Sequence, residues 1–464
     1  MIAGTDIDVD GLRSALLEVI AEERRVNAGE SIRALHADDS SPHPASVPDL
    51  VVFPHTVAEV SAVLALANAR GVAVTPFGMG TSTDGHVIPL RRGISLDLTE
   101  MDGVVRFRPE DQMITVGPGI SRSAVNRRAG EHGLLFPVDP GADASIGGMV
   151  ATNASGTTTV RYGNMRKQVL ALQVVLADGT VVRTGSRALK SSAGYDLGQL
   201  FVGSEGTLGV IVEVTLRLYG IPEHTVAARA AFPDLDAACG AARALIGAGV
   251  LLSRMELLDA YCVQALNRFK DMTLPELPCL LLEFAGSREA VQADSRFAAE
   301  VAAEYGCAEL ELEADHTARV RLWQARHDLP PALAHLRPGS KLMTTDVCVP
   351  ISELPAAVAA GRAAVERLKI VAGIVGHVGE GNYHITYAFD PDDPDEQDRA
   401  EILEAEVIEH ALACGGTCSG EHGIGIGKIR HLATEHADLL PLMRGIKQQL
   451  DPNGILNPGK VFTA

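Results

Sequence analysis

Apolar residues near the start of the chain recur at helical spacing. Between residues 11 and 37, the apolar positions that share one face are Leu12, Leu16, Leu17 and Ile20, which predicts an amphipathic helix. The Pro- and Ser-rich run SSPHPASVPD follows, and this composition is typical of a linker. We therefore predict a helical lead-in and linker over residues 1–47.

At residue 48 the pattern changes to short apolar runs that alternate with amphipathic segments. The run LVVF predicts a strand, and Thr56 with Glu59 has the spacing of a capping box at the start of a helix. This helix should extend to about Ala69 and end at Gly71. The run VAVT predicts the next strand, which leads into a glycine-rich loop.

Further strands are expected at residues 114–116, 170–177 and 181–184, the last two joined by a hairpin turn at Asp178 and Gly179. Apolar residues then alternate with mostly polar ones through Arg217, the pattern of a half-buried strand. These apolar residues are Val210, Val212, Val214, Leu216 and Leu218. Ile221 and Pro222 end the region, and the Ala-rich helical segments and strands such as CLLLEF beyond them predict a second domain of α+β type.

Length and composition are those of a globular protein with two or three domains. A chain of 464 residues is too long for one core, and its residues are 46% apolar but only 4% aromatic, so the cores should be aliphatic. The formal net charge of -19 opposes binding to phosphate backbones, and we predict no nucleic-acid partner. An anionic substrate would need a local positive site.

The cysteines and the first residues bear on the cellular compartment. The seven cysteines are scattered, which predicts reduced and buried thiols, and Cys414 and Cys418 lack the second pair that an iron–sulfur cluster needs. The start MIAGTDIDVD does not resemble a signal or transit peptide, and no run is apolar enough to span a bilayer. We expect a cytoplasmic protein and leave open a peripheral association with the inner membrane.

The loop after the predicted strand VAVT has the sequence PFGMGTS at residues 76–82. Its glycines let backbone N–H groups approach an anion such as a pyrophosphate. It departs from a Rossmann fingerprint, because Thr83 stands where the third glycine would be. Alone, this loop is weak evidence and is better explained as an ordinary tight turn.

Two further loops change this interpretation. They are PVDPGADASIGGMVATNASGT at residues 137–157 and LFVGSEGTLGVI at residues 200–211, with RYGN starting at Arg161 between them. In this order, together with RLWQARHD, TTDVCVP, GHVGEGNYH, GEHGIGIGK and NPGK, they resemble the D-2-hydroxy acid dehydrogenases that use FAD. The resemblance is to the D-lactate dehydrogenase (cytochrome) branch of the vanillyl-alcohol oxidase / p-cresol methylhydroxylase (PCMH) superfamily, and it covers residues 48–461.

The resemblance implies an α+β fold of two domains, a PCMH-type FAD-binding domain and a C-terminal FAD-linked oxidase domain that binds substrate and metal. We assign residues 1–47 to the lead-in, 48–221 to the FAD-binding domain and 222–420 to the substrate and metal domain. Residues 421–464 are expected to return to the FAD-binding domain.

The resemblance also implies which residues hold FAD. They are Pro76, Gly78, Gly80, Thr81 and Ser82 in the first loop, Pro140, Gly141, Ser145, Gly148 and Thr152 in the second, Gly206, Thr207 and Ile211 in the third, and Asn457 near the C-terminus. Some members of the superfamily tether the flavin through a histidine in the first loop, where Thr81 and Ser82 stand in this chain. We therefore expect non-covalent FAD and a structural role for His86.

A metal site is expected around the sequence VGEGNY, which is bracketed by His377 and His384. The flanking apolar residues predict two strands and a turn, and if Val378 pairs with Tyr383, the two histidines face each other closely enough to bind one ion. Two histidines alone would be a weak signal. We assign Glu421, in CSGEHGIGIGK, as the third ligand, because the dense glycines let this backbone come close and leave the carboxylate unobstructed. The resulting His2Glu set leaves coordination positions open and suits Zn(II), Mn(II) or Fe(II).

Oxidation of a 2-hydroxy acid removes the hydroxyl proton and passes the α-hydrogen, formally as hydride, to flavin N5. A metal-bound hydroxyl is more acidic, and we assign His422 as the base that accepts its proton. Arg326 in LWQARHD matches the carboxylate-binding arginine of the family, and its planar fork suits that role. Lys428 and Lys460 are expected to be surface charges.

These residues together predict FAD- and metal-dependent oxidation of a D-2-hydroxy acid, with D-lactate as the first candidate. Electrons would pass to an external acceptor, for which a cytochrome, a quinone and an electron-transfer flavoprotein remain open, and a homodimer is compatible with the sequence. D-2-hydroxyglutarate and glycolate are the alternative substrates. A metal-dependent hydrolase, in which the glycine loops are only turns, and a non-catalytic flavin-binding subunit are the alternatives from other classes.

Overall fold

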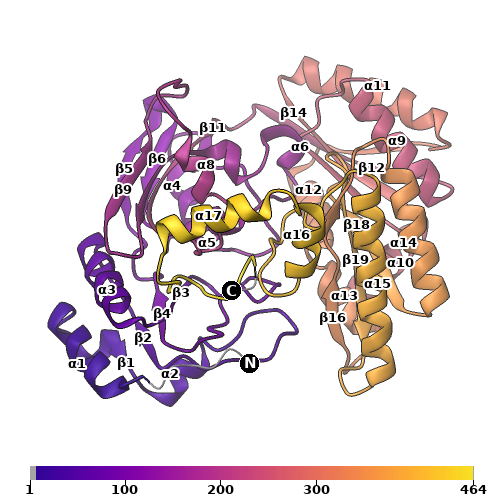
Figure 1. Cartoon of the computed structure of the whole chain (residues 1–464). Helices are drawn as coiled ribbons and strands as arrows, with labels where there is room; N and C mark the ends of the chain where they lie inside the picture. The colour runs from indigo at the N-terminus through magenta and orange to yellow at the C-terminus, as the bar shows by residue number, and fades with distance from the viewer. Residues whose placement is uncertain (1–6, 463–464) are drawn as a thin grey trace. The chain divides into compact units, whose positions relative to one another are not determined.

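The computed structural model describes residues 7–462 and divides into two compact units (Figure 1). Of the described residues, unit 1 contains 7–154, 164–221 and 422–462, and unit 2 contains 155–163 and 222–421. The chain therefore leaves unit 1 after Ile221, where the sequence predicted an end. The short stretch 155–163 lies in unit 2, where α6 (Thr159–Tyr162) contacts β13 (Arg254–Leu258).

The first sheet of unit 1 has four strands in the order β1-β2-β4-β3. The strands β2 (Leu50–Val52), β4 (Ile94–Asp97) and β3 (Val74–Phe77) run parallel, and β1 (Val26–Asn27) pairs antiparallel with β2. The short helices η1 (Glu23–Arg25) and α2 (Glu30–Ala34) flank β1 in the chain.

Two longer helices, α1 (Val9–Val19) and α3 (Val57–Arg70), share the core of this sheet. The capping box of Thr56 and Glu59 is confirmed, and so is the helix end at Gly71, which adopts a left-handed φ of 63°. Helix α1 buries Leu12 and Leu16 in the same core. The N-terminal lead-in is thus part of unit 1, because its apolar face is covered by α3 and the sheet.

The second sheet of unit 1 is antiparallel and has the order β5-β6-β10-β8-β9. Its strands are β5 (Val104–Arg108), β6 (Met113–Val116), β10 (Val210–Arg217), β8 (Val169–Val175) and β9 (Val181–Gly185), with η2 (Pro109–Asp111) between β5 and β6. The predicted hairpin between β8 and β9 is confirmed, and Gly179 in its turn has a φ of 86°.

Strand β10 corrects one expectation, because it is buried on both faces and not half-buried. It lies between β6 and β8 at the centre of the sheet. Val210 and Val212 pack into the core shared with the first sheet, whereas Val214 and Leu216 pack into a second core. An alternating sequence predicts one buried face and one exposed face. Both faces of β10 are buried because each is covered by a different core.

The second core of unit 1 is completed by short helices and a two-stranded pair. The helices are α4 (Arg122–Gly130), α5 (Ile146–Thr152), α7 (Met165–Gln168) and α8 (Leu197–Phe201), and β7 (Leu134–Leu135) pairs with β11 (Tyr219–Gly220). The C-terminal segment adds α16 (Ile429–Glu435) and α17 (Leu440–Leu450) and then bridges to the edge strand β3, where Val74 pairs with Leu456. This bridge places Asn457 beside the first residue of β3, where its backbone N–H donates to the Val74 carbonyl oxygen at 2.8 Å.

Unit 2 is built on one large sheet whose main path has the order β15-β12-β14-β13-β18-β19-β16. Apart from β13, its strands are β15 (Leu310–Glu313), β12 (His224–Ala231), β14 (Cys279–Gly286), β18 (Val371–Gly376), β19 (Asn382–Phe389) and β16 (Lys341–Thr344), with β17 (Val347–Cys348) paired to β19. All the recorded pairings are antiparallel.

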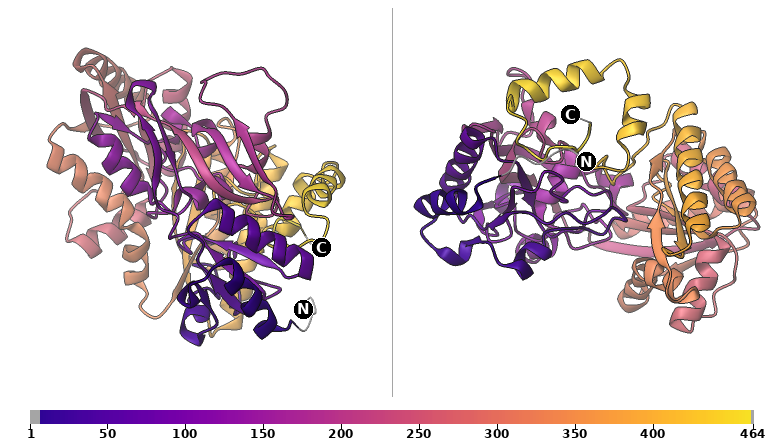
Figure 2. Two further views of the ribbon diagram at one scale, coloured as in Figure 1. Left: turned by 90° about the vertical axis from the view of Figure 1, so that its left-hand side faces the viewer. Right: turned by 60° about the horizontal axis from the view of Figure 1, so that its bottom comes forward.

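Helices cover both faces of this sheet. On one face, α9 (Leu235–Gly247), α11 (Arg288–Glu304), α14 (Leu354–Leu368) and α15 (Pro394–Ala413) contact the strands, and Figure 2 (right) shows α14 and α15 side by side along it. On the other face, α10 (Ala260–Lys270), α12 (His316–His327) and α13 (Leu329–Leu336) share a core with Leu281 and Val375. That second face also carries Glu256, which lies opposite Leu281.

No helix in residues 7–462 is long and apolar enough to cross a membrane. All seven cysteines are free thiols, as expected, and five of them are buried, whereas Cys348 and Cys414 are partly exposed. Lys428 and Lys460 were expected at the surface, and this expectation is wrong: each side chain is only 2% exposed. Their local sequence is polar and glycine-rich, so it did not indicate burial.

Candidate active site

The two histidines of the predicted metal site lie at the junction of β18 and β19 in unit 2. The predicted pairing of Val378 with Tyr383 is wrong, because Val375 lies opposite His384 and Ile374 lies opposite Ile385. This register differs from the predicted one by two residues. A shift of two keeps every side chain on its face, so His377 and His384 still meet, diagonally, with ring centroids 5.5 Å apart.

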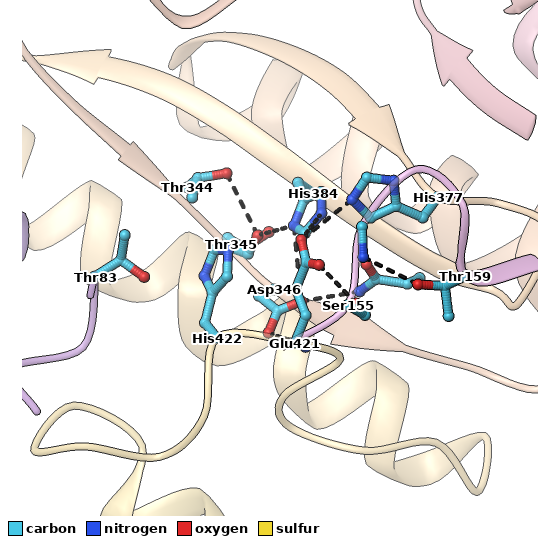
Figure 3. Close-up of polar contacts among 12 residues, drawn as sticks. Thr83, Ser155, Thr159, Thr344, Thr345, Asp346, His377, His384, Glu421 and His422 are labelled. Atoms are coloured by element: carbon cyan, nitrogen blue, oxygen red, sulfur yellow. Dashed lines mark hydrogen bonds and ion pairs between the residues drawn. The ribbon is translucent and has the colours of Figure 1, made fainter. Parts of the chain in front are cut away.

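Glu421 completes this cluster from the end of a separate loop (Figure 3). Its Oε1 lies 3.2 Å from His377 Nε2 and 3.3 Å from His384 Nε2, and one ligand atom of each residue lies within 4.8 Å of the others. Ser155 Oγ donates a hydrogen bond of 2.7 Å to the second carboxylate oxygen. Two imidazoles and a carboxylate around one point fit a divalent cation.

The far nitrogen of each histidine has its own partner. Nδ1 of His377 lies 2.5 Å from Glu256 Oε1, and Nδ1 of His384 lies 3.0 Å from the backbone carbonyl oxygen of Thr345. Such contacts fix the tautomer and the rotation of a metal-binding imidazole. Both rings therefore present Nε2 to Glu421.

The loop that carries Glu421 is held by Asp346 and Asn382. Asp346 Oδ2 accepts hydrogen bonds of 2.9 Å from the Glu421 backbone N–H and from Ser419 Oγ, and Asn382 Nδ2 donates to Asp346 Oδ1 at 2.9 Å. Gly420 has no alternative here, because a Cβ atom on it would collide with Asn382 Nδ2. The prediction that a glycine lets this backbone come close is confirmed at Gly420.

Charges in the cluster are mutually stabilised. Burial would lower the pKa of His377, but Glu256 and Glu421 raise it well above its ordinary value. Burial would likewise raise the pKa of Glu421, but His377 and His384 hold it well below the usual range. Burial raises the pKa of Glu380, in the turn between the histidines, to about 8, because the charge of His377 opposes this effect only in part.

Arg326 lies on α12 of unit 2, and its side chain is 14% exposed. Its Nε donates a hydrogen bond of 2.8 Å to Glu256 Oε2. Within residues 7–462, no hydrogen bond of its two Nη groups is recorded. The side chain is therefore anchored through Nε, and its outer edge has donors for a second carboxylate.

The first glycine-rich loop, residues 76–82 in unit 1, has the backbone of an anion site. None of the N–H groups of residues 78–82 has a hydrogen-bond partner within the described chain, and Gly80 adopts a φ of 63°. A Cβ atom on Gly78 would lie 2.5 Å from Ser145 Oγ, so only glycine allows the two loops to approach this closely. Successive unpaired N–H groups suit the pyrophosphate of FAD.

The other predicted FAD residues are divided between this cradle and the surrounding core. Ser145 caps α5 and accepts from Gly148 N–H at 3.3 Å. A Cβ atom on Gly206 would lie 3.0 Å from Pro76, and Asn457 Nδ2 donates to the carbonyl oxygens of Glu205 (2.7 Å) and His86 (3.0 Å). These contacts bring the first, second and third loops and the C-terminal segment together.

The remaining predicted FAD residues either bond locally, lie in the core or are at least partly exposed. The Thr152 hydroxyl donates to Gly148 O at 3.2 Å, that of Thr207 donates to Ser204 O at 2.7 Å, and that of Ser82 donates to Asp39 Oδ2 at 2.6 Å. Ile211 is buried in the second core. Pro140 is partly exposed, and Gly141 and Thr81 are exposed.

His422 is the first residue of the last segment of unit 1, directly after Glu421. Its Nδ1 lies 3.9 Å from Asp84 Oδ2 within that unit. The loop that follows it is clamped by Glu205, whose carboxylate accepts from the N–H groups of Ile424 (2.7 Å) and Gly425 (2.8 Å). Glu205 also pairs with His86 at 3.3 Å, and both side chains are buried.

Three carboxylates of these networks were not singled out from the sequence. Asp346 lies in TTDVCVP, and Glu205 lies in the third glycine loop, so both were within motifs that had been noticed. Glu256 had a different signal, a lone acidic residue in the apolar strand RMELL. A charge between two buried apolar residues, here Met255 and Leu257, implies a partner from elsewhere in the fold.

Two domain families match the chain in succession. Residues 48–185 match the FAD binding domain, and residues 221–461 match the C-terminal domain of FAD linked oxidases. A "Probable D-lactate dehydrogenase, mitochondrial" from Danio rerio is 44% identical over 98% of this chain and 92% of its own length. The "D-lactate dehydrogenase [cytochrome], mitochondrial" of Arabidopsis thaliana is 40% identical over 90% of this chain and 74% of its own, and "Glycolate oxidase subunit GlcD" of Escherichia coli is 31% identical over 98% and 91%.

Solved structures with much lower identity share the fold. p-Cresol methylhydroxylase with bound substrate aligns with a TM-score of 0.81 at 18% identity, covering 99% of this chain and 98% of its own. Alkyldihydroxyacetonephosphate synthase aligns with a TM-score of 0.77 at 19% identity, covering 99% and 87%. With both domain families in order and close relatives along nearly its whole length, the chain belongs to the FAD-linked oxidases, in the branch of the D-lactate dehydrogenases, and is an FAD-dependent oxidoreductase of the α+β PCMH-type fold.

Proposed function

We propose that this protein oxidises a small D-2-hydroxy acid, with D-lactate as the preferred candidate, to the 2-oxo acid. The observation that carries the proposal is the convergence of His377 Nε2 and His384 Nε2 on one oxygen of Glu421, at 3.2 and 3.3 Å. Two imidazoles and one carboxylate are a catalytic rather than a structural metal set, because a structural site uses four protein ligands. Zn(II), Mn(II) and Fe(II) all suit it.

The roles of the bound groups follow from general chemistry. When bound, FAD would accept the hydride, and a divalent cation held by His377, His384 and Glu421 would make the substrate hydroxyl more acidic. The chain supplies the rest. The outer edge of Arg326 binds the substrate carboxylate, and the His422 imidazole accepts the hydroxyl proton.

Non-covalent binding of FAD is part of the proposal. Its support is the run of unpaired N–H groups at residues 78–82, which can hold a pyrophosphate without a covalent bond. Thr81 and Ser82, at the place of the tethering histidine of some superfamily members, offer no nitrogen for a flavin linkage. We also propose that the other residues assigned to FAD from the family resemblance contact the bound cofactor.

Glycolate and D-2-hydroxyglutarate are the alternative substrates, since relatives named for each are 31–35% identical. The match to two flavin-enzyme domain families argues against the hydrolase alternative. The electron acceptor is proposed to be a cytochrome, a quinone or an electron-transfer flavoprotein. Cytoplasmic localisation remains a prediction, and the relatives from Danio rerio and Arabidopsis thaliana carry the word mitochondrial in their names.

The decisive experiment follows the flavin absorbance of the purified protein anaerobically while single 2-hydroxy acids are added. We expect D-lactate to bleach the flavin faster than L-lactate, glycolate and D-2-hydroxyglutarate at equal concentration. Metal content is measured on the same sample. If glycolate or D-2-hydroxyglutarate bleached the flavin faster, that compound would be the preferred substrate in place of D-lactate. Flavin that no 2-hydroxy acid reduces would indicate a non-catalytic flavin-binding subunit.

A further inference from the structure

One charged side chain of unit 2 is completely buried within an apolar strand. Glu256 on β13 is 0% exposed, and its chain neighbours Met255 and Leu257 are buried as well. Removal of a carboxylate from water is strongly unfavourable unless each oxygen finds a charged or polar partner. The partners of Glu256 therefore indicate what it is there to hold.

Each oxygen of Glu256 has one partner, and both partners belong to the proposed site. Oε1 lies 2.5 Å from His377 Nδ1, and Oε2 accepts a hydrogen bond of 2.8 Å from Arg326 Nε. The two partners come from different elements, the turn after β18 and helix α12. One carboxylate thus joins a proposed metal ligand to the proposed substrate-binding arginine.

These contacts determine which atoms remain for ligands. With Nδ1 engaged, His377 presents Nε2 to Glu421, and with Nε engaged, Arg326 keeps its Nη edge for a carboxylate. Burial would raise the pKa of Glu256, but His377 and Arg326 hold it below its ordinary value. His384 does not share this support, because its Nδ1 contacts the Thr345 carbonyl oxygen.

We propose that Glu256 is a positioning residue that couples metal binding at His377 to substrate-carboxylate binding at Arg326. The proposal rests on the function proposed above and adds to it a residue that touches neither ion nor substrate. Loss of the Glu256 charge should therefore weaken two different binding events at once. A residue that only stabilised the fold would affect neither selectively.

The test compares Glu256→Gln with the wild-type holoenzyme. A chelator titration should show metal affinity lowered by about 10 to 100-fold, the usual effect of removing such a carboxylate. The KM for D-lactate should rise more than kcat falls, because Arg326 loses its anchor. FAD content should stay unchanged, since the FAD loops lie in unit 1. In an Arg326→Lys background, Glu256→Gln should still weaken metal binding but add little to KM.

Two further variants keep the test decisive. Glu311→Gln removes a carboxylate that pairs with Arg229 at 2.5 Å in the same sheet, and it should alter neither metal affinity nor KM. If Glu256→Gln does not fold, Glu256→Asp replaces it, because Asp keeps the charge but withdraws the oxygens, and it should show the same double effect in weaker form.

The possible failures are distinguishable. A Glu256→Gln enzyme with wild-type metal affinity or wild-type KM would overturn the coupling. If the His384→Ala variant still lost its metal in that case, the assignment of the metal site would stand without the coupling. A wild-type enzyme that contains no divalent metal and is unaffected by chelators would instead overturn the metal part of the proposed function, and the coupling with it.

Discussion

Val375, and not His377, lies directly opposite His384 in the pairing of β18 with β19. His377 follows the end of β18, one side-chain repeat further along the same face, and its ring reaches His384 diagonally. The three proposed ligands thus come from a turn, a strand and a separate loop. Replacement of any one of them should leave the backbone of the other two in place.

His377→Ala, His384→Ala and Glu421→Ala should each lose the bound metal on dialysis, because two protein ligands are too few to retain it. Activity should fall by on the order of 1000-fold, the value of several kcal/mol of lost charge stabilisation. Flavin absorbance should persist. Metal analysis and visible spectra check this, with Ser155→Ala as control, since it removes only a hydrogen bond to Glu421. Retention of metal in all three variants would contradict the ligand assignment.

His422→Ala should behave differently from the ligand variants. We expect it to keep both metal and FAD, while flavin reduction by D-lactate slows by roughly 100 to 10,000-fold, the usual contribution of a positioned general base. Partial recovery at higher pH is expected, because hydroxide or an already ionised substrate hydroxyl replaces the base. Stopped-flow reduction beside metal analysis measures both effects. Loss of the metal in the His422→Ala protein would show that His422 is a metal ligand and not the base.

Arg326→Lys keeps the positive charge but loses the planar fork. The ε-ammonium cannot bond Glu256 and a substrate carboxylate in the same geometry, so kcat/KM for D-lactate should fall by on the order of 10 to 1000-fold. FAD content should not change. Steady-state kinetics with a dye acceptor measure kcat/KM. Unchanged kinetics would show that a residue other than Arg326 binds the substrate carboxylate.

Acid precipitation should release the flavin into the supernatant. The reason is that Thr81 and Ser82 replace the tethering histidine in the first loop, whose free N–H groups suit a dissociable pyrophosphate. The absorbance of supernatant and pellet at the flavin maximum measures the distribution. A pellet that stays yellow after washing would indicate a covalent link.

Lys460 should make stability depend on pH in the alkaline range. Its side chain is buried in unit 1 and donates 2.6 Å to the Ile88 carbonyl oxygen, and burial lowers its pKa from 10.5 to about 8. Between these two values the unfolded chain binds more protons than the folded one, so the free energy of unfolding rises with pH.

The corresponding measurement is urea unfolding of the wild type and Lys460→Met at pH 7.5 and 9.5. The wild type should gain ~2 kcal/mol relative to the variant over this interval, because a tenfold difference in proton affinity between the folded and unfolded states corresponds to about 1.4 kcal/mol. An equal pH response of both proteins would show that Lys460 titrates at its ordinary pKa.

Local patterns in the sequence determined the elements whose signals are short-range. Thr56, Glu59 and Gly71 define the ends of α3 because a capping box and a left-handed glycine act within one turn of helix. Asp178 and Gly179 define the β8–β9 hairpin for the same reason. The choice of His377, His384 and Glu421 as a group came from motifs, and the predicted face of the histidines survived an error in register because side chains repeat every two residues.

Tertiary structure alone decided the features that depend on distant partners. Strand β10 is buried on both faces because two cores meet it, Lys460 is buried because the C-terminal segment returns to β3, and Glu256 is paired because α12 and the turn after β18 converge on β13. None of these partners is near in sequence, and burial of a charge is tolerated only once its partner is in place. A sequence pattern reports the preference of one segment, whereas the pairs of Glu256 with His377 and Arg326 join segments that are far apart in the chain.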